Sequence, residues 1–243
     1  MIRFGQQSAF FKLIGEEVDK IIECFVIGGS AMMFYGAKEE TKDVDMVFME
    51  KASADKIKEV LHKIGFREKK SMMPIFKRYE EATNKPTMMV RGDDRFDLFL
   101  KEIITCKMSE SIIGRVRETH EFGNLHVKIV SPEDIILLKC ATEREKDRID
   151  ALSLMEKFNI DWNIVIEESI NQTRIGEEVF PVYLYDFLSE LKDDLQADIP
   201  KDVLTRIRKI AEEEMVKVLK RGKSVVEKAA KKKGKAAPAG SII

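Results

Sequence analysis

The sequence of 243 residues lacks the features of several protein classes. It has no uninterrupted apolar run near the length of about 18 residues that a membrane-spanning helix needs, and its first residues carry no basic segment followed by an apolar one. Its three cysteines lie far apart without CxxC spacing, which argues against a disulfide framework and against a zinc knuckle. We therefore expect a soluble cytoplasmic protein with no membrane contact and with reduced, buried cysteines.

An excess of charge of one sign is also lacking. The chain has 42 Lys and Arg residues, 43 Asp and Glu residues and a formal net charge of −1, and its 44% apolar content suits an ordinary globular core. This balance hides an asymmetry, because nine basic residues and one acid, Glu227, lie between Lys217 and Lys235. That end carries +8 and leaves −9 on the rest of the chain. Such a basic tail can contact nucleic acid through phosphates, and a solvated helix end is the alternative.

Hydrophobic periodicity predicts an α/β (α+β) body followed by a helical extension. The first elements are expected to be a helix over 8–23, a strand over 24–27, a helix over 30–35, a strand over 44–48 and a helix over 51–64. Alternation and turn-forming residues between Phe66 and Leu100 favour antiparallel strands there, and a hairpin is expected over 118–130. In the segment 95–100, period two places Phe96, Leu98 and Leu100 on one face and Asp97 on the other.

The sequence predicts a helix start at Ser131, where Ser as N-cap is followed by Pro132 and two acids. Further helices are expected over 146–158, 183–191 and 202–219. These patterns predict three regions: a catalytic-type domain over 1–158, a helical C-terminal extension over 159–222 and a basic tail over 223–243. The last is expected to be disordered because it has few apolar residues.

The chemistry-bearing pattern begins with Gly28-Gly29-Ser30, where a short apolar strand ends and a helix opens. Glycines let a backbone approach phosphate closely, and amides at a helix start, with the Ser30 hydroxyl, can hold negative oxygens. Asp43 and Asp45 follow at i and i+2 on a strand, so both carboxylates point to the same side.

A third carboxylate on a paired strand would complete a two-metal site, and Asp97 is the best candidate. Hard oxygen ligands of this kind suit Mg²⁺ or Mn²⁺ together with the phosphates of a substrate. Phosphates at the glycine turn and metals at the aspartates would then lie side by side, an arrangement suited to phosphoryl transfer at a nucleotide.

The string Gly-Gly-Ser, Gly36, Thr41-x-Asp-x-Asp and a later strand Asp resembles the nucleotidyltransferase domain of the DNA polymerase beta superfamily. Within it, the sequence is most similar to small prokaryotic nucleotidyltransferases related to abortive-infection toxins. Those also tend to carry a Pro-Glu-Asp-led helix with a Lys, here Lys139, and then a Lys-Asp-x-x-Asp helix, here with Asp147 and Asp150. The resemblance covers about residues 10–158. One departure is that Glu39 and Glu40 precede the Thr where a basic residue is common, with Lys38 further back.

The resemblance implies a mixed sheet flanked by helices, and it implies roles for individual residues. Asp43, Asp45 and Asp97 would bind the metals and form the catalytic set, with Asp97 activating the acceptor hydroxyl. The triphosphate would be held by Gly28, Gly29 and Ser30. Lys139 would contact phosphate, and Asp147 with Asp150 would shape the same pocket. The residues themselves leave other interpretations open: Lys139 could cover core surface with its charge in solvent, and Asp150 could pair with Lys146 at i,i+4 on the surface.

We therefore expect an enzyme that moves a nucleoside monophosphate from an NTP to a hydroxyl. The acceptor is an RNA 3′ end such as tRNA in the favoured interpretation, with a protein hydroxyl or a small molecule as the others. The alternative is a non-catalytic regulatory module, similar to a toxin-antitoxin partner, that binds nucleotide or nucleic acid on the same fold.

Overall fold

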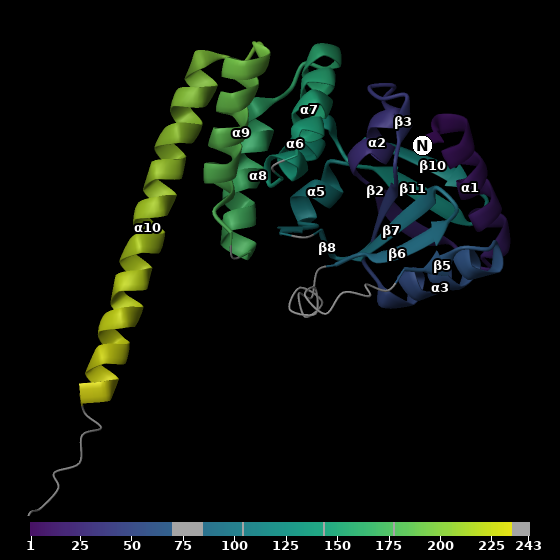
Figure 1. Ribbon diagram of the computed structural model, residues 1–243, viewed down its shortest axis with the longest axis horizontal. Coiled ribbons are helices and arrows are strands. Elements are labelled where there is room, and N and C mark those ends of the chain that lie inside the picture. The colour runs from purple at the N-terminus through teal and green to yellow at the C-terminus, as the bar shows by residue number, and fades with distance from the viewer. Residues whose placement is uncertain (70–84, 104, 143, 177, 235–243) are drawn as a thin grey trace, which may run out of the picture.

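The computed structural model describes residues 1–69, 85–103, 105–142, 144–176 and 178–234, with side chains up to residue 220. A seven-stranded sheet in the order β10-β11-β2-β4-β7-β6-β5 forms the centre of the N-terminal half (Figure 1). β2 pairs with β11 and β4 pairs with β7 in parallel, and the other neighbours are antiparallel. The predicted mixed sheet is thus confirmed. Its strands are β2 (Ile22–Val26), β4 (Val44–Phe48), β5 (Arg67–Glu68), β6 (Thr87–Arg91), β7 (Asp94–Leu100), β10 (Glu118–Phe122) and β11 (Leu125–Ile129).

Two short antiparallel pairs lie beside the main sheet, formed by β1 (Ile2–Arg3) with β3 (Glu40–Thr41) and by β8 (Glu102–Ile103) with β9 (Cys106–Lys107). The helices are α1 (Phe4–Glu17), α2 (Gly28–Phe34), α3 (Lys51–Lys63), α5 (Glu110–Gly114), α6 (Pro132–Cys140), α7 (Glu145–Lys157), α8 (Trp162–Ile175), α9 (Phe180–Leu195) and α10 (Lys201–Gly234). The helices from α6 onwards lie at the end of the molecule opposite α1 and α3 (Figure 1).

One face of the sheet is covered by α1 and α3. α1 contacts β10 and β11, whereas α3 contacts β4 and β7. Three phenylalanines, Phe10, Phe66 and Phe96, meet there edge to face, with ring centroids 5.2 to 5.7 Å apart. Edge-to-face packing of buried rings stabilises a core beyond the area it buries. The other, polar face of β4 and β7 is turned toward α6 and α7, and the candidate site lies between them.

The end of α1 differs from the one expected. α1 ends at Glu17 rather than at 23, because Ile22 and Glu23 belong to β2, which pairs with β11. On β7, Phe96 and Leu98 are buried, whereas Leu100 is 42% exposed. β7 ends at Leu100, before Lys101 adopts a positive φ of 62°.

The C-terminal half is helical, as predicted. The Ser131 hydroxyl accepts from the Asp134 amide and caps α6, which contacts α8 and α9. α10 packs on α9, is helical to Gly234 and runs past the end of α9 (Figure 1). It therefore extends beyond the expected end at 219 and into the predicted tail, whose residues 235–243 lie outside the described residues. The three region boundaries remain predictions.

Among the residues that the structure describes, no helix is both long and apolar enough to cross a membrane. The three cysteines are free and buried, as predicted.

The helical half is joined to the body by a buried charged cluster. Arg115, just after α5, donates from Nη2 to Asp134 Oδ1 at 2.6 Å on α6 and to Glu168 Oε2 at 2.7 Å on α8. Asp134 is fully buried and Glu168 is 2% exposed. Ser109 and Gln172 also donate to Glu168. Because buried charges are tolerated when paired and hydrogen-bonded, this cluster fixes where α6 lies relative to α8.

Gly15 tests how closely α1 approaches the β10–β11 turn. A Cβ there would lie 1.5 Å from the Phe122 carbonyl oxygen, which is a backbone atom and cannot rotate away as a side chain could. We expect Gly15→Ala to lower the free energy of unfolding by about 3 kcal/mol or more, measured by urea denaturation. Gly5→Ala in the same helix is the control, because a Cβ at that position meets nothing within 4 Å. It should leave stability unchanged or raise it by up to about 1 kcal/mol. Equal effects of the two substitutions would contradict the packing described.

Candidate active site

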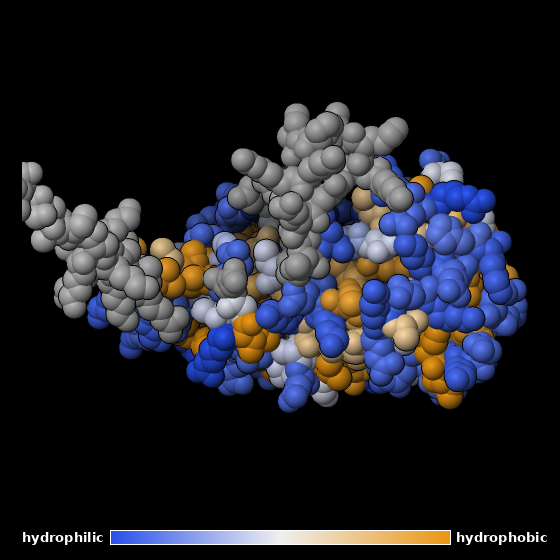
Figure 2. All heavy atoms as spheres, turned by 90° about the horizontal axis from the view of Figure 1, so that it is seen from below, coloured by the Kyte–Doolittle hydropathy of each residue, from blue (hydrophilic) through white to orange (hydrophobic). Residues whose placement is uncertain are grey.

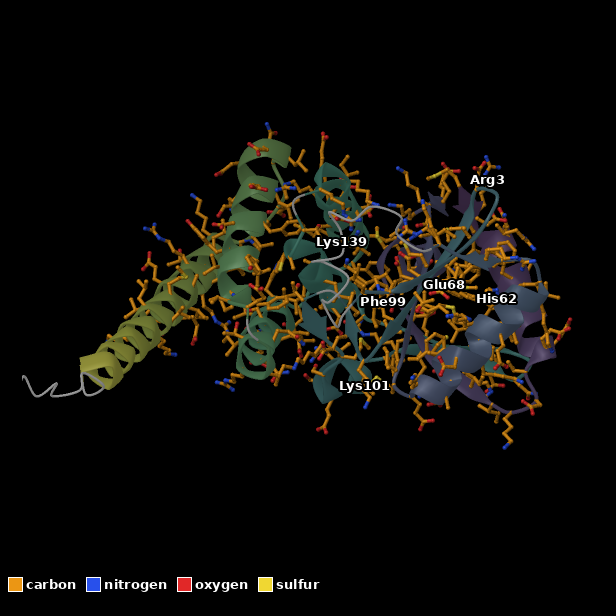
Figure 3. The ribbon with its side chains drawn as sticks, turned by 60° about the horizontal axis from the view of Figure 1, so that its bottom comes forward. Arg3, His62, Glu68, Phe99, Lys101 and Lys139 are labelled. Atoms are coloured by element: carbon orange, nitrogen blue, oxygen red, sulfur yellow. The ribbon has the colours of Figure 1, made fainter. Side chains whose placement is uncertain are left out.

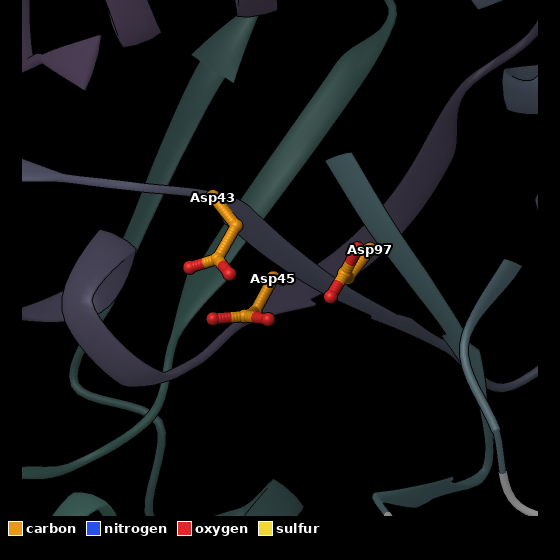
Figure 4. Close-up of side chains that lie close together, drawn as sticks. All are labelled: Asp43, Asp45 and Asp97. Atoms are coloured by element: carbon orange, nitrogen blue, oxygen red, sulfur yellow. The ribbon is translucent and has the colours of Figure 1, made fainter. Parts of the chain in front are cut away.

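Three aspartates converge at the middle of the sheet. The parallel register of β4 with β7 places Asp45 directly beside Asp97, and Asp43 lies two residues before Asp45 on the same side. One carboxylate oxygen from each residue lies within 4.8 Å of those of the other two (Figure 4). The grouping of Asp43, Asp45 and Asp97 expected from the sequence is therefore present.

The cluster is electrostatically strained. Burial, reinforced by the charges of Asp43 and Asp97, raises the pKa of Asp45 to about 8. Burial also raises the pKa of Asp97, which is 4% exposed. Three neighbouring carboxylates with little solvent repel one another, so a bound cation stabilises their ionised forms.

The donor set suits a hard divalent ion. All three ligands are carboxylates, with oxygen atoms close enough to share one or two ions, and Mg²⁺ and Mn²⁺ prefer such oxygen donors. The residues present therefore fit the ion that the sequence pattern implies.

Gly28 and Gly29 border the aspartates at the start of α2. Gly28 has a φ of +59°, and a Cβ there would lie 2.9 Å from Asp45 Oδ2, so a larger residue would be both strained and crowded against the carboxylate. Gly29 lies against the Thr41 side chain. The first amides of a helix have no intrahelical acceptor, so this turn presents donors beside the carboxylates.

Ser30 occupies a different position from its glycine neighbours. It is fully buried and does not line the cleft, and its hydroxyl donates to the Asp43 carbonyl oxygen at 3.2 Å. Gln7 Nε2 in turn donates to the Ser30 carbonyl oxygen at 3.3 Å. Ser30 therefore supports the backbone of Asp43. Of the three residues predicted to hold phosphate at this turn, Gly28 and Gly29 line the cleft and Ser30 does not.

The aspartates and the two glycines open into a cleft of about 1010 Å³. One wall is the polar face of the sheet and the other comes from α6 and α7, with Lys139 and Phe99 lying between the two halves of the molecule (Figure 3). The surface of the N-terminal half is mainly hydrophilic in the view of Figure 2. The cleft has an apolar part, formed by Ile27, Pro86, Met88, Phe99, Ile103 and Leu138.

Lys139 is held inside the cleft by two of the predicted residues. It is 6% exposed, and its Nζ donates to Asp147 Oδ1 at 2.8 Å and to Asp150 Oδ2 at 2.6 Å. Burial acts to raise the pKa of Asp147, but Lys139, Thr142 and Arg144 hold it below its usual value. The alternative in which Lys139 covers the core and keeps its charge in solvent is therefore excluded. Lys139, Asp147 and Asp150 form one hydrogen-bonded unit.

Lys38 is a cleft residue that the sequence pattern did not single out. Its Nζ pairs with Asp150 Oδ1, and its side chain lies near Gly29. Both oxygens of Asp150 thus serve lysines other than Lys146, so the surface i,i+4 pair considered from the sequence is not formed. Where similar proteins often have a basic residue just before the Thr, this chain has Glu39 and Glu40, and a cation of the cleft, Lys38, precedes them.

Arg95 is the second residue that the sequence pattern missed. On β7 it lies two positions before Asp97 and shares its face of the strand, a period-two signal that was available in the sequence. Its Nε donates to Asp97 Oδ1 at 2.7 Å and its Nη2 donates to Asp97 Oδ2, while its Nη1 lies 3.9 Å from Asp43 Oδ2. The guanidinium therefore neutralises part of the aspartate cluster.

The chain thus combines a mixed sheet, facing carboxylates on two parallel strands and a glycine turn that opens a helix. The chain belongs to the family described as nucleotidyltransferase of unknown function (DUF6036), whose profile matches residues 7–186. The matched region includes every site residue named above.

Among solved structures, the chain is similar to an antigenic nucleotidyltransferase-like protein from Paracoccidioides brasiliensis. The two share 17% sequence identity with a TM-score of 0.45, over 84% of this chain and 98% of the other. No curated protein matches the sequence. The narrower resemblance to abortive-infection toxins remains a prediction.

The strain in the aspartate cluster gives a testable pH dependence. A carboxyl whose pKa is raised on folding contributes stability at low pH, and this contribution is lost as the pH rises from its unfolded value near 4 to about 8. With EDTA present, Asp45→Asn should therefore raise Tm by about 2–4 °C at pH 8 and by less at pH 6. Asp55→Asn is the control, because Asp55 is exposed on α3. A lower Tm for Asp45→Asn at both pH values would contradict the repulsion described.

Proposed function

We propose that this protein transfers a nucleoside monophosphate from an NTP to a hydroxyl acceptor. The observation that carries the proposal is the convergence of Asp43, Asp45 and Asp97 with the Gly28-Gly29 turn in one cleft. Family membership supports nucleotidyl transfer at the level of the class.

The chain's own residues supply the parts that such a transfer needs. In this proposal the amides of Gly28 and Gly29 donate hydrogen bonds to phosphate oxygens beside the aspartates. Lys139 uses two of its three ammonium hydrogens on Asp147 and Asp150, which leaves one for a phosphate oxygen. Asp147 and Asp150 thus orient Lys139 and limit how far its ammonium can move.

The aspartates would hold Mg²⁺ or Mn²⁺, which would supply charge neutralisation at the phosphates and would favour loss of the proton from the acceptor hydroxyl. Asp97 is the carboxylate we assign to the acceptor hydroxyl, because it comes from β7 while Asp43 and Asp45 lie next to the glycine turn. In this role it accepts the hydroxyl proton as the new bond to phosphorus forms and pyrophosphate leaves.

For the acceptor we favour an RNA 3′ end such as that of tRNA. The support is the basic end of the chain from Lys217, since clustered lysines attract phosphates without reading sequence. A protein hydroxyl and a small molecule are the other acceptor classes.

A second candidate function is a non-catalytic module that binds nucleotide or nucleic acid and regulates a partner, as in toxin-antitoxin pairs. The observation that favours it is the engagement of both Asp97 oxygens by Arg95, which competes with proton acceptance by Asp97. The two candidates share the binding site and differ in turnover.

Metal-dependent nucleotide binding tests the site. We expect Mg²⁺ with an NTP to raise Tm of the wild-type protein, because a ligand that binds the folded state stabilises it. Asp43→Asn combined with Asp45→Asn should weaken metal-dependent NTP binding by about 100-fold, or about 2.7 kcal/mol, in titration calorimetry. Asp55→Asn should bind like the wild type. Equal binding by the double variant would refute the metal-site assignment.

Turnover separates the enzyme from the module. The protein is incubated with Mg²⁺, each labelled NTP in turn, and total RNA or total protein. We expect label to appear covalently on RNA with at least one NTP, and the Asp97→Asn protein to give none. Label on protein instead would move the acceptor to the second class, and NTP binding without transfer to any acceptor would favour the module.

A further inference from the structure

Arg95 lies on the polar face of β7 with its guanidinium against a candidate metal ligand. Nε and Nη2 donate to the two different oxygens of Asp97, so the contact is bidentate. Asp97 is 4% exposed, and both residues line the cleft. A guanidinium keeps its charge at all accessible pH values, so this pairing cannot be relieved by loss of a proton.

This contact uses the oxygens that Asp97 would offer to a divalent ion. A bidentate guanidinium occupies the carboxylate edge, and a second cation at the same edge is repelled by its charge. The third nitrogen, Nη1, extends the positive charge to 3.9 Å from Asp43 Oδ2. Arg95 and a divalent ion are therefore competitors for the same side of the cluster.

Arg95 also has access to the cleft. Its side chain is 38% exposed, and it lines the cleft together with Gly28 and Gly29. Guanidinium binds phosphate with the same planar fork that it uses for carboxylate. A triphosphate in the cleft therefore offers Arg95 another anion of higher charge.

The lysines of the cleft are placed differently. Lys139 is held between Asp147 and Asp150, and Lys38 pairs with Asp150. These carboxylates lie outside the aspartate cluster, so moving either lysine onto a phosphate would not release a candidate metal ligand. Among these cations, only Arg95 would free a candidate metal ligand, Asp97, if it moved onto a phosphate.

We propose that Arg95 exchanges between Asp97 and a nucleotide phosphate, so that it weakens divalent-ion binding in the free protein and strengthens nucleotide binding. This inference rests on the proposed function, because it takes the aspartates as the ion site. Nucleotide binding then prepares Asp97 for the ion, and the two ligands are linked through one side chain.

The test measures each ligand by itself in wild type, Arg95→Gln and Arg95→Lys. Mn²⁺ without nucleotide is titrated by EPR of the free ion, and a non-hydrolysable ATP analogue is titrated with EDTA present by calorimetry. Arg95→Gln should bind Mn²⁺ about tenfold more tightly and the analogue about tenfold more weakly than wild type, each about 1.4 kcal/mol. Arg95→Lys keeps the charge but loses the fork, so it should shift both affinities in the same directions by less.

Lys42→Gln is the matched control, because Lys42 is an exposed cation next to Asp43 in sequence and does not line the cleft. It should change neither affinity by more than about twofold. Each variant is compared at a temperature where circular dichroism shows it folded, and Arg95→Lys carries the test should Arg95→Gln unfold.

Opposite shifts of the two affinities support the exchange. Unchanged or weaker Mn²⁺ binding by Arg95→Gln would overturn it and leave Arg95 as a residue that positions Asp97. An unchanged affinity for the analogue would overturn it as well. Failure of the wild type and every variant to bind Mn²⁺ would instead refute the aspartate site of the proposed function.

Discussion

The parallel pairing of β4 with β7 is the constraint on which the site depends. Its register sets Asp45 against Asp97, and the same strands place Phe96 and Met46 on the opposite face, in the core. A shift of one residue would bury the carboxylates beneath α1 and α3 and expose the apolar face. The hydrophobic core and the aspartate cluster therefore specify each other, and neither could move along the sheet alone.

The cleft is organised by charge compensation on two levels. Around Lys139 the cations and carboxylates belong to the chain, and their pairing fixes one wall. At the aspartate cluster, Arg95 is the cation that forms ion pairs with these carboxylates among the described residues, so the negative charge is incompletely balanced. The first is a structural polar network, whereas the second would be stabilised by a bound cation. The same difference explains why the pKa of Asp45 is raised and that of Asp147 is lowered.

The sequence was sufficient for features with local signals. Strand periodicity identified Asp97, the glycine turn located the start of α2, and Ser131 marked a capped helix. It was insufficient where a tertiary contact determines the local structure. Ile22 lies in a strand because it pairs with β11, and the Ser30 hydroxyl donates to the Asp43 carbonyl oxygen rather than facing the cleft. Lys38 was missed because its partner, Asp150, lies far away in the sequence, and no spacing reveals such a pair. Arg95 was missed because Asp97 was considered only as a metal ligand, although the two residues are spaced by two on one strand.

The Arg115 cluster has a consequence for how this chain can be divided. Glu168 on α8 supplies one of the two carboxylates that hold Arg115, and the other, Asp134, lies on the helix that carries Lys139. A fragment ending at residue 158 would keep the whole aspartate cluster but would leave the arginine half paired and one side of α6 bare. The position of the helix that carries Lys139 therefore depends on a carboxylate that lies beyond residue 158.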